Sequence, residues 1–138
     1  MAPIAYATHC QSFCAAHRLH NKDLTDIENR ECFGRCNHIS SHGHNYKVEV
    51  TVVGEINPVY GYAINLVDFK KYILQVVDPL DHKRIDTDID WFKQKNIATA
   101  ENIALYIWNE LEKVLPSTVK LYNIRLHETE KNYIDFRG

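Results

Sequence analysis

Apolar and polar residues alternate along two long stretches of the chain, residues 4–17 and residues 42–55. Successive side chains of a β-strand point to opposite faces, so residues two apart share a face. Both stretches are therefore predicted to be strands. His42 and His44 begin the apolar face of the second strand. The same face continues through Tyr46, Val48, Val50 and Val52.

Apolar residues at helical spacing predict two longer helices in the second half of the chain. Asn65 can cap the first helix, with Asp68 at its N3 position, and Pro79 ends it. Thr99 can cap the second helix, and Pro116 follows its end. The apolar stripe of the second helix consists of Ala100, Ile103, Ala104, Ile107, Leu111 and Val114.

Two shorter segments lie between these longer elements. Thr25 and Glu28 have the spacing of a capping box and predict a short helix, which Gly34 is suited to end. Cys36 then follows in a loop, where a thiol is accessible for chemistry. Residues 86–94 have an acidic and then mixed composition and are predicted to be irregular.

The remaining alternating segments predict three further strands. Residues 62–66 are expected to form a hairpin with residues 42–55, and strands follow at residues 119–128 and 133–137. Glu128 continues an apolar row, and a carboxylate in that position requires a partner. The other members of the row are Tyr122, Ile124 and Leu126.

The order of these elements predicts an α+β domain with helices on one face of an antiparallel sheet. The length of 138 residues corresponds to a single domain, residues 1–138. If the hairpin at residues 62–66 is counted as an extension of the second long strand, the chain has about four strands, which are too few to close a barrel within one chain. Because bare sheet edges promote association, we expect the chain to associate through them.

Charge and composition give no indication of a nucleic-acid or membrane partner. The net charge is −2, and 45% of the residues are hydrophobic, as in an ordinary globular protein. No apolar run is long enough to span a bilayer, and no signal-peptide pattern begins the sequence, so a cytoplasmic location is predicted. The four cysteines are then expected to be reduced thiols.

Histidine spacing indicates metal binding. His42 and His44 lie side by side on one predicted strand face, as in a bidentate metal clamp. His17 ends the other long strand on its apolar face, which makes it the candidate third ligand. The alternative for His17 is a buried histidine bonded to the backbone. Cys36 lies six residues before His42, within reach of the same site.

Five motifs are spread over nearly the whole chain. They are Phe13-Cys14-Ala15-Ala16-His17-Arg18-Leu19, then Phe33-Gly34-Arg35-Cys36 followed by His42-Gly43-His44-Asn45-Tyr46, then Pro79-Leu80-Asp81-His82-Lys83, Thr99-Ala100-Glu101-Asn102 and Glu128-Thr129-Glu130-Lys131-Asn132. In this order they resemble the 6-pyruvoyl-tetrahydropterin synthase family of the tunnelling-fold superfamily. The resemblance implies a four-stranded antiparallel sheet with two helices on one face. It further implies that three sheets join into a barrel and that two trimers form a homohexamer.

The resemblance also implies a zinc-dependent lyase of tetrahydrobiopterin biosynthesis. Such an enzyme converts 7,8-dihydroneopterin triphosphate to 6-pyruvoyl-tetrahydropterin and eliminates triphosphate. The reaction is an internal redox rearrangement, which agrees with the lack of a dinucleotide-binding or P-loop motif in the sequence. One Zn²⁺ per subunit is implied, and a Mg²⁺ ion on the substrate triphosphate would leave no motif.

The implied metal ligands are His17, His42 and His44, a set that leaves open positions for two substrate hydroxyls. The metal would act as a Lewis acid. Cys36 matches the catalytic cysteine of the family, and its thiolate would act as a general base.

The remaining motifs imply proton carriers and a pterin pocket. Asp81 and His82 match an acid–imidazole pair that meets the cysteine across a subunit interface in the family. Glu128 matches the pterin-anchoring glutamate, whose carboxylate can accept two parallel N–H bonds from the aminopyrimidine edge. Glu101 and Thr99 match a second part of that pocket.

Two alternatives remain open. The related enzyme 6-carboxy-tetrahydropterin synthase has the motif Cys-x3-His-Gly-His, whereas here five residues separate Cys36 from His42. A non-catalytic zinc-binding module would instead require a closed ligand set, with a thiol as the fourth ligand. The sequence does not decide which cations bind the triphosphate among Arg18, Arg35, Lys47 and Lys131.

Overall fold

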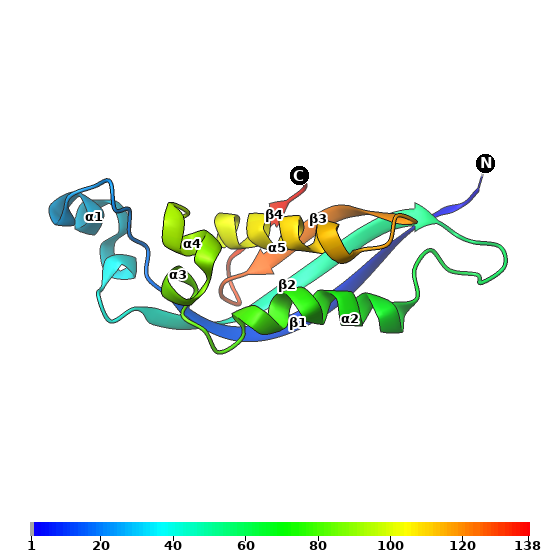
Figure 1. Cartoon of the computed structure of the whole chain (residues 1–138), viewed down its shortest axis with the longest axis horizontal. Helices are drawn as coiled ribbons and strands as arrows, with labels where there is room; N and C mark the ends of the chain where they lie inside the picture. Colours follow the sequence, from blue (N-terminus) through cyan, green and yellow to red (C-terminus); the bar gives the residue numbers. More distant parts are fainter. Residues whose placement is uncertain (1) are drawn as a thin grey trace.

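A computed structural model of the protein describes residues 2–138 and contains one antiparallel sheet (Figure 1). Its four strands lie in the order β1, β2, β3, β4. They are β1 (Ile4–His17), β2 (His42–Glu55), β3 (Val119–His127) and β4 (Tyr133–Phe136). β1 and β2 pair along their whole length, which confirms the two long strands predicted from alternation.

Two longer helices lie on one face of this sheet, as predicted (Figure 1). They are α2 (Leu66–Val77) and α5 (Ala100–Val114), which contact each other. Within residues 2–138, no helix combines the length and the apolar character that a membrane crossing requires.

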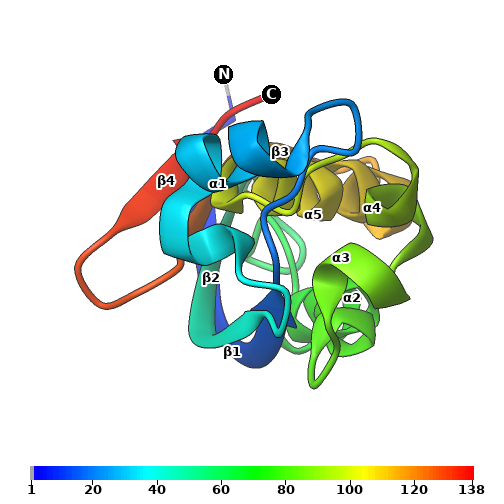
Figure 2. The ribbon, with the colours of Figure 1, turned by 90° about the vertical axis from the view of Figure 1, so that its left-hand side faces the viewer.

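Shorter helices gather toward one end of the molecule. Figure 2 looks onto that end, where α1 (Asp26–Phe33) and the 3-10 helix η1 (Gly34–Asn37) connect β1 to β2. Along the chain, α2 is followed by η2 (Asp78–Leu80), α3 (Ile85–Asp88) and α4 (Asp90–Gln94), which precede α5. The chain therefore leaves the sheet at this end twice.

The core lies between the sheet and the two longer helices. Four side chains of β2 face the helices and are fully buried, namely Tyr46, Val48, Val50 and Val52. Phe69 and Ile73 of α2 and Ile103 and Ile107 of α5 belong to the same core. Burying one such side chain contributes roughly 1.5–3 kcal/mol. This packing fixes which face of β2 points toward the helices.

Side-chain caps fix the starts of the helices, as predicted. Thr25 Oγ1 accepts a hydrogen bond from Glu28 N at 3.2 Å, and Glu28 Oε1 accepts one from Thr25 N at 3.0 Å. These two bonds complete the capping box of α1. Asn65 and Thr99 cap α2 and α5 with their side-chain oxygens.

The predicted strand at residues 62–66 is wrong. β2 already pairs with β1 on one side and with β3 on the other, so it has no free edge for a hairpin partner. The chain instead leaves β2 through a tight loop in which Asn57 N donates to Tyr62 O at 3.1 Å. Asn65 then starts α2.

The predicted irregular segment at residues 86–94 is also wrong, because it forms most of α3 and α4. Ile85 of α3 and Phe92 of α4 are buried, and Ile89, whose backbone is extended, separates the two helices. These apolar anchors hold two short helices against the core. The extended residue Ile89 divides the segment into helices of four and five residues, which are too short to give a periodic signal in the sequence.

A β-bulge changes the predicted face of Tyr122. The pairing of β2 with β3 shifts next to Thr51, so β3 carries one additional residue. Such an extra residue reverses the alternation of side chains. Tyr122 is therefore exposed and packs on Tyr6, with ring centroids 4.8 Å apart. Ile124 and Leu126 keep the buried face, as predicted.

Candidate metal centre and active site

The pairing of β1 with β2 brings the three predicted metal ligands together. His17 lies directly opposite His42, and Ala15 lies opposite His44. Residues two apart on a strand share a face, so all three imidazoles extend from the face that the helices cover. His17 precedes His42 by 25 residues, and the strand pairing alone brings them into contact.

The three imidazole rings form a compact cluster. Ring centroids lie 4.6 Å apart for His17 and His42, 5.1 Å for His17 and His44, and 4.9 Å for His42 and His44. One ring nitrogen from each residue lies within 4.8 Å of the others, and His17 Nε2 is 3.0 Å from His42 Nε2. Three imidazole nitrogens this close together can bind one metal ion.

Two further residues orient His17. Its Nδ1 donates to Ala98 O at 2.7 Å, so Nε2 of the neutral ring carries a lone pair. The Tyr46 hydroxyl lies 3.4 Å from the same Nδ1. Burial lowers the pKa of His17, which favours the neutral, metal-binding form. Burial, and to a smaller extent Glu128 and Cys36, raises the pKa of the Tyr46 phenol, so its hydroxyl stays protonated.

His44 presents a buried nitrogen that lacks a hydrogen-bond partner within residues 2–138, its Nε2. Glu128 Oε1 lies 3.7 Å away, which is too far for a hydrogen bond. Burial lowers the pKa of His44, and the nearby Glu128 charge partly opposes this shift. A buried polar atom without a partner is costly. A metal ion shared by three neutral imidazoles would satisfy it, so the residues present fit zinc.

Cys36 lies close to the end of β1 but outside the histidine cluster. Leu19 N donates to Cys36 O at 2.8 Å, which ties η1 to the residues just after His17. The Cys36 residue is half-buried. In the part of the chain that the structure describes, the side chains close enough to share a metal ion are histidines alone. Cys36 therefore does not close the ligand set.

Asp81 and His82 lie at the outer edge of β1. Asp81 Oδ1 accepts a hydrogen bond from Cys14 N at 2.9 Å, and Asp81 Oδ2 lies 3.0 Å from His82 Nδ1. The Cys14 bond, and then the His82 bond, lowers the pKa of Asp81, so its carboxyl stays ionised. His82 has a φ of 60°, which is uncommon outside glycine, and its side chain is 82% exposed. The His82 imidazole is therefore open to solvent and free to meet another molecule.

Glu128 and Glu101 line one small pocket of about 190 Å³ beside the start of α5. Its other walls are Ala100, Leu126, Asn132, Tyr133 and Ile134. The structure thus brings together two of the three predicted pterin-pocket residues. Thr99 does not line the pocket, because its hydroxyl caps α5 by accepting from Asn102 N at 3.2 Å. Since Glu128 lies 3.7 Å from His44, the pocket adjoins the histidine cluster.

Sequence reasoning did not identify the two groups that orient His17, although its alternative for this residue, a buried histidine bonded to the backbone, agrees with the burial of His17 and its bond to Ala98 O. The Ala98 contact uses a backbone carbonyl, which leaves no signal in the sequence because every residue has one. Tyr46 could have been found, because it follows His44 by two residues on the same strand face. A hydroxyl on that face would have indicated a polar partner near the histidines.

Comparison with known proteins shows similarity along almost the entire chain. A family model described as 6-pyruvoyl tetrahydropterin synthase matches residues 6–138. A Poecilia reticulata protein named 6-pyruvoyl tetrahydrobiopterin synthase is 52% identical over 136 residues, covering 98% of this chain and 91% of that protein. The human protein of the same name is 49% identical over 128 residues, covering 92% of this chain and 87% of its own.

A solved structure agrees with the sequence comparisons. The Caenorhabditis elegans 6-pyruvoyl tetrahydropterin synthase matches with a TM-score of 0.93 at 40% identity, covering 99% of this chain and 97% of that one. The shared fold therefore includes the histidine-bearing strands and the connecting helices. On these grounds, the chain belongs to the 6-pyruvoyl tetrahydropterin synthase family.

Proposed function

We propose that the protein converts 7,8-dihydroneopterin triphosphate to 6-pyruvoyl-tetrahydropterin, a step of tetrahydrobiopterin biosynthesis. Family membership supports an enzyme of the lyase class. In this reaction two hydrogens move from the substrate side chain to the pterin ring. The C–O bond to the triphosphate breaks, and its electron pair leaves on the triphosphate oxygen. The reaction therefore needs no external oxidant or reductant.

One observation carries the proposal: a cluster of three histidines that could hold a metal ion adjoins a carboxylate-lined pocket. His44 Nε2 lies 3.7 Å from Glu128 Oε1, and Glu128 lines that pocket. A pterin held by Glu128 would direct its side chain toward the three histidines. Substrate recognition and proton chemistry would then occur within a few ångströms of each other.

His17, His42 and His44 would hold one Zn²⁺ per subunit. When bound, zinc would supply a Lewis acid that makes neighbouring hydroxyl and C–H protons more acidic. Three neutral imidazoles with no fourth protein ligand form the open arrangement of catalytic sites. This arrangement favours an enzyme over a non-catalytic zinc module, which would need a closed set.

Cys36 would act as the general base, because its backbone is tied to the residues just after His17 and its sulfur is outside the ligand cluster. Asp81 and His82 would carry protons for a neighbouring subunit. The Asp81 carboxylate accepts a hydrogen bond from His82 Nδ1, which leaves the lone pair of the neutral ring on Nε2. That nitrogen belongs to a side chain that is 82% exposed, so another subunit can reach it.

Glu128 would anchor the pterin by accepting two N–H bonds from its aminopyrimidine edge. Glu101 lies in the same pocket and would add a second acceptor. Thr99 would act mainly through α5, since its hydroxyl caps that helix. A Mg²⁺ ion bound to the triphosphate is compatible with this arrangement.

Assembly would complete the active site. β1 and β4 are the outer strands of the sheet, and a four-stranded sheet is too narrow to close on itself. Three chains would join their sheet edges into a barrel, and two such trimers would form a homohexamer. Residues 1–138 would act as one domain in that assembly.

Product analysis with 7,8-dihydroneopterin triphosphate tests the proposal directly. The zinc-loaded protein should release triphosphate and 6-pyruvoyl-tetrahydropterin, identified by mass spectrometry. Formation of 6-carboxy-tetrahydropterin would instead indicate the related enzyme. The spacing of Cys36 to His42, with five residues between them, favours the first outcome. Unchanged substrate with a full zinc complement would support the non-catalytic module.

A further inference from the structure

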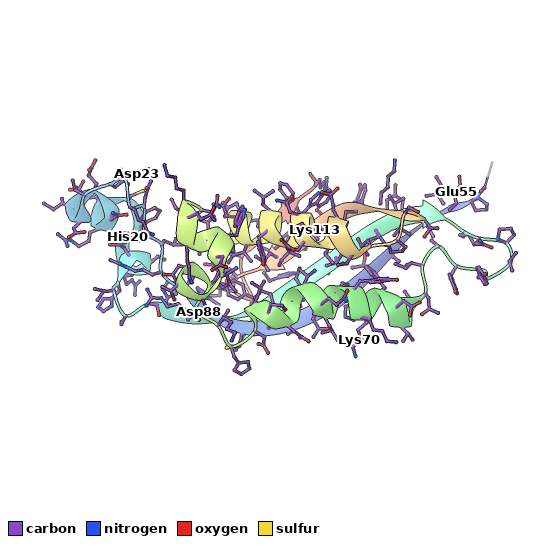
Figure 3. All side chains as sticks on the ribbon, in the orientation of Figure 1. His20, Asp23, Glu55, Lys70, Asp88 and Lys113 are labelled. Atoms are coloured by element: carbon purple, nitrogen blue, oxygen red, sulfur yellow. The ribbon has the colours of Figure 1, made fainter. Side chains whose placement is uncertain are left out.

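A pocket of about 500 Å³ lies at the other end of β2 from the histidine cluster. Its lining includes Glu55, the last residue of β2, whereas His42 is the first residue of that strand. In Figure 3, Glu55 is labelled at one end of the molecule and His20 toward the opposite end. The proposed reaction therefore does not use this pocket.

Three tyrosines line this pocket, which we name the tyrosine pocket: Tyr60, Tyr62 and Tyr72. Tyr60 and Tyr62 belong to the loop between β2 and α2, and their rings stack with centroids 5.6 Å apart and an angle of 14° between the planes. Their exposed fractions are 66% and 40%, so a ligand can reach both rings. Tyr72 extends from α2 and is half-buried. The pocket thus presents several electron-rich aromatic faces.

The charged side chains of the lining are two carboxylates, those of Glu55 and Asp68. Among residues 2–138, no lysine, arginine or histidine lines the pocket. In the same part of the chain, neither carboxylate belongs to an ion pair. The negative charge at this pocket is therefore not balanced by a neighbouring side chain, which favours a cationic ligand.

We infer that the tyrosine pocket binds a small organic cation, that is, an ammonium group attached to an apolar or aromatic body. Aromatic faces attract ammonium groups, and the two carboxylates add to that attraction. Pro58, Ile64 and Pro116 supply apolar contacts for the body of the ligand. The volume lies within the range of about 300–1,000 Å³ that is usual for small-molecule sites.

Hydrogen bonds hold the tyrosine-bearing loop in place before a ligand arrives. Asn57 N donates to Tyr62 O at 3.1 Å, and Gly61 N donates to Asn57 O at 2.7 Å. Asn57 Oδ1 also accepts a bond from Val59 N at 2.8 Å. Gly61 has a φ of 77°, which glycine adopts without strain. A loop fixed in this way loses little conformational freedom when it binds a ligand.

The start of α2 does not make this pocket an anion site. The first N–H groups of a helix attract anions when they are unbonded. Here Asn65 Oδ1 accepts bonds from Val67 N at 2.9 Å and from Asp68 N at 3.1 Å. The carboxylate of Asp68 adds negative charge to the same turn. An anion at this position would therefore meet repulsion, whereas a cation would not.

The position of the pocket agrees with the proposed assembly. Its walls come from the loop before α2, from the start of α2 and from the segment between α5 and β3 of one chain. Within residues 2–138, no wall comes from β4 or from β1 itself, the two outer strands of the sheet. Joining those strands between chains would leave the opening of the pocket free.

Binding of benzyltrimethylammonium to the zinc-loaded protein tests the inference. Ligand-observed NMR of its trimethylammonium protons gives the affinity. The probe carries a permanent positive charge beside an aromatic ring. Benzyl alcohol has the ring without the charge and should bind at least about fivefold more weakly, because it loses the cation–π contact. Benzoate carries the opposite charge and should bind more weakly still.

Variants locate the binding. Tyr62→Leu should weaken binding of benzyltrimethylammonium about fivefold, because leucine is apolar but has no aromatic face. Asp68→Asn should weaken it about two- to threefold, since it removes one of two solvent-exposed carboxylates. Tyr122→Leu is the matched control, because it removes an exposed tyrosine outside the pocket and should leave the affinity unchanged. Glu128→Gln, which changes the other carboxylate-lined pocket, should also leave it unchanged.

Tyr62 and Asp68 are exposed, so their replacement should leave the fold and the zinc content unchanged, which thermal melting and elemental analysis check. Equal affinities for the three probes, or no binding of the cation, would overturn the inference. So would a larger loss of affinity in Glu128→Gln than in Tyr62→Leu, because the cation would then occupy the proposed pterin pocket. Tighter binding of N-acetyl-lysine amide than of benzyltrimethylammonium would identify a protein side chain, instead of a small molecule, as the ligand.

Discussion

The three clustered histidines differ in how firmly the protein holds them. His17 is fully buried, and its Nδ1 is bonded to Ala98 O. His42 and His44 are only partly buried. Replacing His17 would therefore disturb packing as well as metal binding. His42 is the better position for a test of the metal site alone.

We predict that His42→Ala abolishes tight zinc binding and turnover while the protein remains folded. Two imidazoles bind zinc far more weakly than three. Elemental analysis gives the zinc content, and circular dichroism verifies the fold. His9→Ala is a suitable control, because His9 lies on the same face of β1 but outside the cluster and should leave zinc in place. A full zinc complement in His42→Ala would show that the ligand assignment is wrong.

Cys36→Ala should also lose turnover, but unlike His42→Ala it should keep its zinc. The zinc content should stay near one per subunit, because the sulfur lies outside the ligand cluster. Turnover should fall by ~10²–10⁴, the usual contribution of a general base. Cys32→Ala, which changes an exposed cysteine of α1, should have neither effect. Zinc loss in Cys36→Ala would identify the thiol as a ligand.

At the scale of elements, an ion pair ties β4 to β3. Arg125 and Asp135 lie opposite each other in the sheet, and two bonds of 2.8 and 3.0 Å join them. Asn123 donates a further bond to Asp135 at 3.0 Å. Arg125, and to a smaller extent Asn123, lowers the pKa of Asp135 to about 2. β4 is short, so this cross-strand pair matters for keeping it in the sheet.

The stabilisation from Asp135 should depend on pH. Its pKa in the folded protein lies below the unfolded value of about 3.9, so the contribution is present above that pH and declines as pH falls toward about 2. Urea unfolding should show that the wild type loses more stability than Asp135→Asn between about pH 5 and about pH 3.

A matched control separates this effect from general acid destabilisation. Asp90 forms an ion pair with Lys93 at 3.4 Å, but its side chain is 91% exposed. Such exposed pairs contribute little, so Asp90→Asn should follow the wild-type pH dependence. Parallel curves for Asp135→Asn and the wild type would contradict the role assigned to the Arg125 pair.

Periodicity and capping residues predicted most elements, because these signals are local. Asn65 and Thr99 can cap the start of a helix whatever the fold of the rest of the chain. The prediction of a hairpin strand at residues 62–66 was wrong for a non-local reason, because β3 pairs with the second edge of β2. The predicted face of Tyr122 was wrong because a β-bulge depends on how the strand pairs with its partner strand.

The predictions for the candidate site divide in the same way into those that rest on local signals and those that depend on non-local contacts. His42 and His44 could be paired from their spacing, whereas the contact of His17 with them depends on the register of β1 against β2. The contact of His17 with the Ala98 carbonyl depends on tertiary structure, which no local pattern encodes. The resemblance to a known family implied a role for Cys36, which spacing alone left open.

At the scale of the whole molecule, the sheet has two outer strands that are only partly covered. Residues 81–84 run along one end of β1, where Ala16 N donates to Lys83 O at 2.9 Å and His82 N donates to Cys14 O at 2.6 Å. The earlier part of β1 has no second partner strand within residues 2–138. Exposed strand edges of this length favour pairing with another chain.

We therefore expect a hexamer at micromolar protein concentration. Sedimentation velocity provides the measurement, with the mass of 16.1 kDa per chain as the unit. Joining the β1 edge of one chain to the β4 edge of another would satisfy the open edges of both. A monomer under these conditions would remove the shared active site and leave His82 without a reaction partner.

Complementation tests whether His82 acts in a neighbouring subunit. Cys36→Ala and His82→Ala chains should each be inactive, and co-expression of the two should restore part of the activity. A mixed hexamer contains sites with an intact cysteine from one chain and an intact histidine from another. Native mass spectrometry confirms mixing. Mixed hexamers without recovered activity would mean that one chain supplies all of these groups.

The bond between His17 and Ala98 spans 81 residues and has a consequence for the order of events during biosynthesis. A two-stranded ribbon of β1 and β2 is marginally stable alone, and its histidine-bearing face gains its full cover only after α2 and α5 have both been added. Contacts this distant in sequence form late, after the cost of closing a long loop is met. A nascent chain can therefore bring its three histidines together once β1 and β2 pair, but it cannot fix the ring of His17 against Ala98 O until residue 98 has left the ribosome. The orientation of this first candidate ligand becomes one of the last steps of maturation.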